Sequence, residues 1–189
     1  MYKNTAGKFD IIHLAMHTLI NNENPTLTKM LFSKSGESDD NFGLNVYEIY
    51  EIPLIAKMVV LSSCNTGSGY LHRGEGVLSL ARGFIYSGSK SVVMSLWEVN
   101  DKSGTDIVKS FYRHIKNGSK KSEALRNARI EYLKTAGQFR SHPYFWSTLV
   151  VYGDDSPLYI SAATKTMIII IPALLIPGIV IYFRNRRYS

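Results

Sequence analysis

Cysteine is nearly absent from this sequence of 189 residues, in which it occurs once, at position 64. One cysteine excludes a framework of internal disulfides, so the fold has to be stabilised by packing. An N-terminal export signal is also lacking, because residues 1–8 are polar and lead directly into an apolar run. What the sequence does contain is a hydrophobic content of 45%, with 12% aromatic residues, enough for the core of one ordinary domain with an appendage.

Signatures of nucleic-acid and nucleotide binding are missing as well. The net charge is +7, but much of the excess lies at the C-terminus, in Arg184, Arg186 and Arg187, and no aromatic residues interleave with a basic stripe. The glycines that follow Cys64 lead to no Gly-Lys-Ser/Thr sequence, and His72 occupies the third glycine position of a dinucleotide fingerprint. We therefore expect no nucleic-acid partner, no cofactor and no metal site.

Two apolar runs each end in a side chain that is capable of nucleophilic chemistry. The run over residues 9–17 ends in His17, and the run over residues 58–64 ends in Cys64. We predict that the strands ending at His17 and Cys64 are adjacent and parallel. Sites of open parallel sheets form at the carboxyl ends of the strands, so these strands would bring an imidazole to a thiol and favour the attacking thiolate. The alternative is that Cys64 is a small buried hydrophobe. His13 lies deeper on the same strand face and is interpreted as a hydrogen-bonded histidine of the core or an interface.

The remaining pattern predicts strands that alternate with helices. A short strand is expected within residues 26–33, an amphipathic turn over 46–52 capped by Asn45, helices over 76–87, 101–115 and 119–134, and strands over 91–97 and 146–152. Alternation of this kind implies an α/β fold with a mostly parallel sheet and flanking helices.

Three further groups are candidates for the chemistry of the site. Glycines after Cys64 allow backbone amides to form an oxyanion hole beside it. Asp101 is a weak candidate for substrate binding, since an aspartate ahead of a helix is first of all a cap. His142 is a weaker one, because it precedes a proline and the backbone there is extended. No carboxylate can be assigned as the group that orients His17.

Residues 167–183 form an uninterrupted apolar run, with Lys165 before it and arginines after it. Its length is at the short end of the roughly 17–25 residues that span a bilayer. We expect a domain over residues 1–160, followed by a membrane anchor with a basic tail over residues 161–189. The positive-inside rule places the tail in the cytoplasm and the domain outside, provided that an export signal precedes the chain; otherwise the chain is tail-anchored against the rule.

The ordered motifs identify a resemblance. They are His-Leu-Ala-Met-His at 13–17, Val-Val-Leu-Ser-Ser-Cys-Asn-Thr-Gly-Ser-Gly at 59–69, Gly-Glu-Gly-Val-Leu-Ser-Leu-Ala-Arg-Gly-Phe at 74–84, Ser-Leu-Trp-Glu-Val-Asn-Asp at 95–101, Glu-Ala-Leu-Arg-Asn-Ala-Arg at 123–129 and His-Pro-Tyr-Phe-Trp at 142–146. In this order they resemble a CHAT domain, a caspase-like family usually found behind tetratricopeptide repeats. The resemblance covers about residues 9–155. It implies a cysteine endopeptidase fold related to caspases and separases, with His17 as catalytic histidine, Cys64 as nucleophile and repeats in cis or in trans as partners.

The sequence departs from the family pattern in two respects. Thr18 stands where glycine usually follows the catalytic histidine, and a β-branched residue tolerates positive φ poorly; the oxyanion amides would be those of Thr18 and Cys64. The strands that usually precede the histidine strand are missing, which leaves an open sheet edge. We expect a membrane-anchored, caspase-like endopeptidase acting on protein substrates. The alternatives are a non-catalytic CHAT module that acts as an interaction or signalling domain, and an unrelated α/β small-molecule enzyme that uses Cys64.

Overall fold

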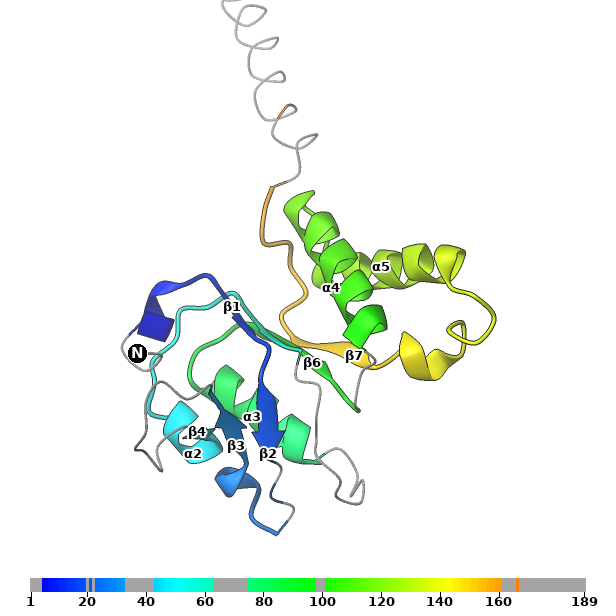
Figure 1. The fold of residues 1–189 in the computed structure, drawn as a ribbon. Coiled ribbons are helices and arrows are strands. Elements are labelled where there is room, and N and C mark those ends of the chain that lie inside the picture. The colour runs from blue at the N-terminus through cyan, green and yellow to red at the C-terminus, as the bar shows by residue number, and fades with distance from the viewer. Residues whose placement is uncertain are drawn as a thin grey trace, which may run out of the picture.

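The computed structural model of the chain describes residues 5–19, 21, 23–32, 43–62, 75–97, 101–160 and 166 (Figure 1). Its main sheet has the strand order β1-β5-β6-β7, formed by β1 (Ile11–Leu14), β5 (Met58–Leu61), β6 (Ser91–Ser95) and β7 (Leu149–Gly153). β1, β5 and β6 run parallel, and β7 is antiparallel to β6. The predicted α/β fold with a mostly parallel sheet is thereby confirmed over the described residues.

A second, antiparallel sheet was not predicted. It consists of β2 (His17–Leu19), β3 (Lys29–Leu31) and β4 (Gly43–Asn45) in that order. The prediction that one strand runs through residues 9–17 and ends in His17 is wrong, because β1 ends at Leu14 and His17 begins β2. The cause is local pairing: Thr18 lies opposite Met30, and both are buried, at 3% and 1% exposure.

Alternating side chains of the main sheet supply two separate cores. On one face, Ile12, Val59 and Val92 pack with α2 (Val46–Ile49) and α3 (Glu75–Tyr86). On the other face, Val60 and Val93 pack with α4 (Asp101–Lys116) and α5 (Lys121–Thr135). This follows from the two-residue period of a strand, which sends neighbouring side chains to opposite faces. Figure 1 shows α4 and α5 together on one side of the sheet.

The helix boundaries follow from local hydrogen bonds and from one buried charge. At the start of α2, the N–H of Asn45 donates to Oε2 of Glu48 at 2.8 Å, as in a capping box. α3 ends before Gly88, whose φ of 110° is favourable only for glycine. α5 begins at Lys121, two residues later than predicted, and the ammonium of this lysine is fully buried. It donates to the backbone oxygens of Asp154 at 2.9 Å and Ser156 at 2.8 Å, which fixes α5 to the segment after β7.

The prediction of a membrane anchor is corrected. The helix expected over residues 167–183 falls outside the described residues, and of the expected tail only Thr166 is described. Among the helices in the described ranges, none combines the length and the apolar composition that crossing a bilayer requires. This finding contradicts the predicted single-pass localisation, with the domain outside and the tail in the cytoplasm. The prediction rested on hydropathy alone, and an apolar composition does not by itself establish a helix long enough to span a bilayer.

Candidate functional site

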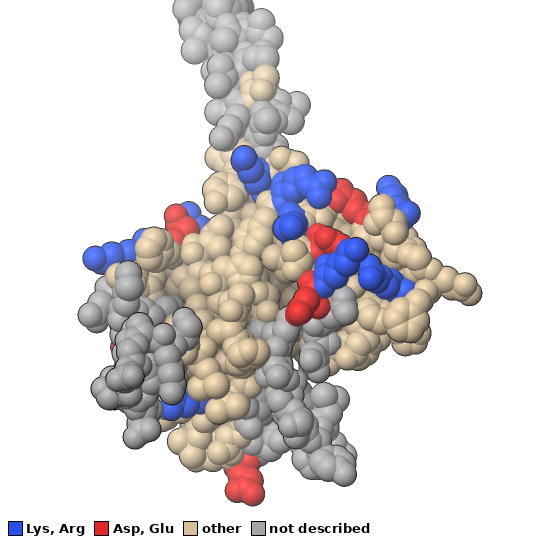
Figure 2. All heavy atoms as spheres, in the orientation of Figure 1, with Lys and Arg blue, Asp and Glu red and all other residues tan. Residues whose placement is uncertain are grey.

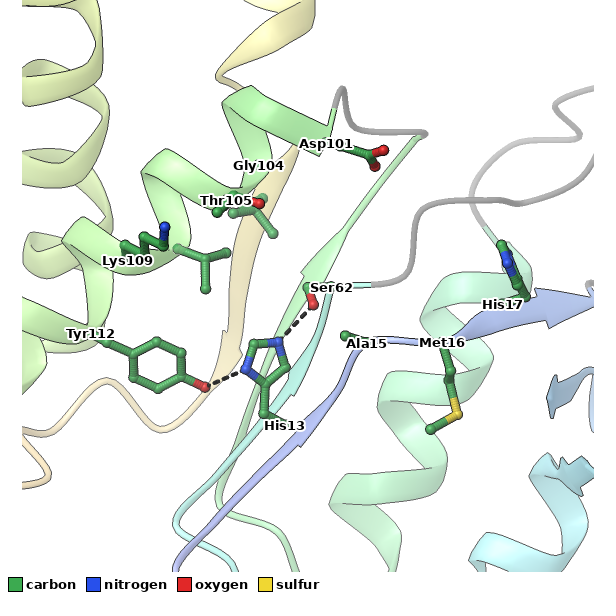
Figure 3. Close-up of a pocket in the computed structure, with 12 residues that line it drawn as sticks. His13, Ala15, Met16, His17, Ser62, Asp101, Gly104, Thr105, Lys109 and Tyr112 are labelled. Carbon is green, nitrogen blue, oxygen red and sulfur yellow. Dashed lines mark hydrogen bonds between the residues drawn. The ribbon is translucent and has the colours of Figure 1, made fainter. Parts of the chain in front are cut away.

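A pocket of about 620 Å³ opens where the carboxyl ends of β1 and β5 face α4. Its wall on the sheet side comes from the residues that follow these strands, Ala15, Met16 and Ser62, together with His13. Its wall on the helix side is one face of α4, on which residues recur at positions i, i+3 and i+4: Asp101, Gly104, Thr105, Val108, Lys109 and Tyr112 (Figure 3). His17, at the start of β2, lines it as well.

The structure brings the two predicted strands together. β1 and β5 are adjacent and parallel, with Leu14 opposite Leu61, which confirms the predicted neighbourhood of the two strands. His17 is exposed toward the pocket, and Ser62, two residues before Cys64, lines the same pocket. Cys64 itself lies outside the described residues, so its role as nucleophile stays a prediction. What the described residues establish is that β5 delivers the chain to the pocket that His17 lines.

Thr18 occupies the middle of β2 rather than a turn. Its side chain is buried at 3% exposure, and its backbone pairs with Met30 of β3. The residue after His17 therefore belongs to an extended ladder, and packing of its side chain accounts for a β-branched residue here. The contribution of its amide to an oxyanion hole stays a prediction.

The two weaker candidates lie in different places. Asp101 is the first residue of α4, is exposed and lines the pocket at the helix N-terminus. His142 is the N-cap of a short 3-10 helix, η3 (Pro143–Phe145), where its Nδ1 accepts a hydrogen bond from the N–H of Tyr144 at 3.3 Å. His142 is not among the residues that line the pocket. A role in substrate binding stays a prediction for both residues, and the geometry favours Asp101.

His13 was interpreted as a core or interface histidine, and the structure gives it a different position. It is hydrogen-bonded, as expected, but it lies on the wall of the pocket and not in the core, exposed on one side and partly covered by the ring of Tyr112. Its Nε2 lies 2.6 Å from Oγ of Ser62, and its Nδ1 lies 3.2 Å from the hydroxyl of Tyr112 (Figure 3). Partial burial lowers the pKa of His13 and raises the pKa of Tyr112 to about 12. At neutral pH the hydrogen bond between them therefore joins a neutral imidazole to a protonated phenol.

Sequence analysis missed Ser62 and Tyr112, and only one of them carried a signal. Ser62 follows β5 on the face of Val60, which lies opposite His13 in the strand register, so the alternation of side chains brings Ser62 toward the imidazole. Tyr112 is 99 positions away from His13 and comes from α4, so nothing in the local sequence indicates the contact.

The electrostatic surroundings of the pocket are mixed. Among the residues that the structure describes, Asp101 and Lys109 line it from α4, so both signs of charge are present beside the two histidines. Figure 2 shows acidic and basic side chains side by side near α4 and α5, instead of one continuous basic face. Within the described ranges, no group of three or more His, Cys, Asp and Glu side chains lies close enough together to hold a metal ion.

Comparison with known proteins assigns the family. The family model described as the CHAT domain matches residues 2–154. The chain belongs to the CHAT domain family. Tetratricopeptide repeat protein 28 of Homo sapiens is 30% identical to it over 115 residues, which cover 61% of this chain and 4% of that protein. The protein of the same name from Mus musculus is also 30% identical over 115 residues, or 61% of this chain and 5% of its own length.

These matches bear on the resemblance identified from the motifs. This CHAT domain chain spans about one twentieth or less of the length of the curated relatives that it matches. The names of both relatives refer to tetratricopeptide repeats, in agreement with the expected attachment of CHAT domains to such repeats. The pocket between β1, β5 and α4 lies within the matched region and is the candidate site of this CHAT domain.

Proposed function

We propose that this CHAT domain is a caspase-like cysteine endopeptidase module in which Cys64 is the nucleophile and His17 the general base. The observation that carries the proposal is the parallel pairing of β1 with β5, because it directs His17 and the segment leading to Cys64 to one pocket. A pocket at the carboxyl ends of parallel strands is where α/β sheets form their sites. Its volume of about 620 Å³ is in the range of ligand pockets and accommodates a segment of an extended peptide.

The proposed reaction proceeds by acyl transfer in two steps. The Cys64 thiolate forms a bond to the carbonyl carbon of the scissile peptide, and the amide nitrogen leaves as an amine after receiving a proton from the His17 imidazolium. Neutral His17 then takes a proton from water, whose oxygen attacks the thioester. The products are a carboxylic acid and the restored thiol. Backbone amides of Thr18 and Cys64 would stabilise the negative charge on the carbonyl oxygen in both steps.

Asp101 and Lys109 are the charged groups available for orienting a peptide in this pocket. They lie eight residues apart on the same face of α4, while apolar side chains such as Met16 and Val108 line the surface between the elements. A pocket of this composition binds apolar side chains in its interior and polar groups at its charged positions. We propose that Asp101 contributes to substrate binding, and that His142 does so only if a substrate extends beyond the pocket.

The single cysteine makes a direct test possible without a known substrate. Iodoacetamide added to the intact chain modifies Cys64 alone among cysteines, and mass spectrometry measures the rate. A thiol activated by an imidazole carries about ten times more thiolate at pH 7 than a free thiol, so His17→Ala is expected to slow the modification about tenfold. His114→Gln is the matched control, because His114 pairs with Glu131 of α5 at 3.0 Å and does not line the pocket.

Proteolysis supplies the second measurement. Cleavage of an unstructured protein such as casein by the intact chain should be abolished by Cys64→Ala and nearly abolished by His17→Ala, because both act as one unit. Retention of full cleavage by Cys64→Ala would overturn the assignment of the nucleophile. Modification of Cys64 at the same rate with and without His17 would show that the two residues do not form a dyad.

A second candidate function is a non-catalytic CHAT module that acts through protein interaction. Burial of Thr18 in β2 favours it. The residue after His17 is fixed in an extended conformation by its pairing with β3 and by its buried side chain, whereas a glycine could adopt other backbone conformations there. This candidate predicts that Cys64 reacts as an ordinary thiol and that no protein substrate is cleaved. The same two assays therefore decide between the candidates.

A further inference from the structure

Three elements meet at one imidazole on the wall of the pocket. His13 comes from β1, Ser62 from the end of β5 and Tyr112 from α4. The Nε2 atom of His13 lies 2.6 Å from Oγ of Ser62, and its Nδ1 atom lies 3.2 Å from the Tyr112 hydroxyl. The rings of His13 and Tyr112 are also in contact, with centroids 5.6 Å apart. One side chain thus joins the sheet to the helix that forms the opposite wall.

The two hydroxyls take opposite hydrogen-bonding roles when the imidazole is neutral. A neutral imidazole has one donor and one acceptor nitrogen, so one hydroxyl donates to the ring while the other accepts from it. In one tautomer the Tyr112 hydroxyl donates to Nδ1 and the Nε2–H donates to Ser62; in the other, the Ser62 hydroxyl donates to Nε2 and the Nδ1–H donates to Tyr112. Both tautomers keep the two hydrogen bonds, so the His13 side chain joins Ser62 to Tyr112 in either case.

Ser62 is held on both its backbone and its side chain. Its N–H donates to the carbonyl oxygen of Leu14 at 3.1 Å, which continues the β1–β5 pairing beyond the last residue of β5. Its hydroxyl is bound to His13, which Tyr112 holds from the other side. The end of β5 is therefore fixed to β1 by a backbone hydrogen bond and to α4 by the side-chain hydrogen bonds through His13. Cys64 follows only two residues later in the sequence.

We propose that His13 is a positioning residue: through Ser62 and Tyr112 it fixes the end of β5 against α4, and thereby sets where the segment that carries the nucleophile leaves the sheet. The inference rests on the proposed function, in that it names a residue on which the reactivity of Cys64 depends. It assigns to the first histidine of the motif a role distinct from that of His17. His13 itself takes no proton from the substrate or the thiol in this scheme.

The test compares two replacements of the same residue in the intact chain. His13→Leu introduces an apolar side chain of similar bulk and removes both hydrogen bonds. His13→Gln offers a donor and an acceptor on one amide group and retains the bridge between Ser62 and Tyr112. Modification of Cys64 by iodoacetamide at pH 7 should be about fivefold slower in His13→Leu and within about twofold of the wild type in His13→Gln, since only the former loses the alignment that favours the thiolate.

Tyr112→Phe tests the hydrogen bond on the other side of His13. It also keeps the proposal testable if the His13→Leu variant does not fold. It removes one of the two hydrogen bonds of His13 and should slow the modification about twofold to threefold, less than His13→Leu, which removes both. Added to His13→Leu, it should have no further effect, because the partner of the hydroxyl is already gone. His114→Gln, which breaks a histidine contact away from the pocket, should react at the wild-type rate.

The outcomes separate this proposal from the function on which it rests. If Cys64 is modified slowly in His17→Ala but at the wild-type rate in His13→Leu and Tyr112→Phe, the dyad stands and the role of His13 is overturned. An equal loss in His13→Leu and His13→Gln also overturns it, because hydrogen bonding would then not be the cause. A wild-type rate in His17→Ala contradicts the dyad itself, whatever the His13 variants do.

Discussion

Replacement of Lys121 tests the account of how α5 is fixed to the main sheet. The side chain of this lysine has 0% exposure, and its ammonium donates to two backbone oxygens and to the Asp154 carboxylate, the last at 3.2 Å. Lys121→Met keeps most of the apolar stem and removes the donors. The two carbonyls each lose a partner but are only partly buried, so each loss costs about 1–2 kcal/mol, the lower part of the range for an unsatisfied buried group. The Asp154 carboxylate is 41% exposed, so water replaces much of what it loses.

The expected decrease in the free energy of unfolding is therefore about 2–4 kcal/mol, at or below the range of about 3–5 kcal/mol for breaking a fully buried ion pair. For a domain of this size, each kcal/mol lowers Tm by about 2–4 °C, which predicts a loss of about 5–15 °C. Urea unfolding followed by circular dichroism measures the free energy directly, and the m-value should not change.

Lys120→Met is the matched control for this measurement. Lys120 precedes Lys121 at the start of α5 but is exposed, so its replacement should change the free energy by no more than about 0.5 kcal/mol. If the two variants unfold at the same temperature, the buried ammonium does not contribute as the contacts indicate, and the argument is refuted.

Two further predictions concern backbone strain and acid. Gly88→Ala should destabilise the chain by about 1–3 kcal/mol in urea unfolding, since a Cβ at a φ of 110° would meet the Leu54 carbonyl oxygen; Gly137→Ala, in open space, should not. Hydrogen bonds from Ser156 are the largest cause that lowers the pKa of Asp154 from 3.8 to about 2. The stability that the Asp154 carboxylate contributes is therefore present above pH 3.8 and lost as the pH falls toward 2. Asp154→Asn should accordingly reduce the fall in the free energy of unfolding between about pH 4 and about pH 2. An unchanged fall would contradict the assignment.

The main sheet was predictable because its two central strands, β5 and β6, are buried on both faces. Met58–Leu61 and Ser91–Ser95 are short runs in which every residue is buried, and such runs stand out in the sequence as strands of a parallel sheet. The helices over α3 and α4 were located within a residue or two by their apolar period. In both cases the local pattern and the tertiary environment require the same residues.

The small sheet could not be predicted in the same way. Hydropathy continues from β1 into His17–Leu19, so nothing in the sequence marks the change from one sheet to another at Ala15 and Met16. The partner strand, Lys29–Leu31, is only three residues long, and its one fully buried side chain is that of Met30. Pairing partners of this length are decided by the surrounding core, which a single sequence does not display.

The site was predictable to the extent that it follows from strand ends. The neighbourhood of β1 and β5, and with it the place of His17 at the pocket, follows from two apolar runs with polar termini. The contact between His13 and Tyr112 does not, because the two residues are 99 positions apart and α4 is brought to the sheet by tertiary packing of its apolar face. Sequence patterns therefore located the pocket, and the tertiary structure identified the side chains that surround it.

The change of sheet after β1 has a consequence for the place of His17. His17 is joined to the main sheet by two residues, Ala15 and Met16, which span at most about 7 Å. The small sheet that begins with His17 has its own hydrogen-bond ladders, yet Met30 of β3 and Leu44 of β4 are buried in the same core as Ile12 and Val59 of the main sheet. Two sheets with separate ladders thus share one core. The place of the His17 imidazole at the pocket is therefore set by the packing of that core as well as by the short connection to β1.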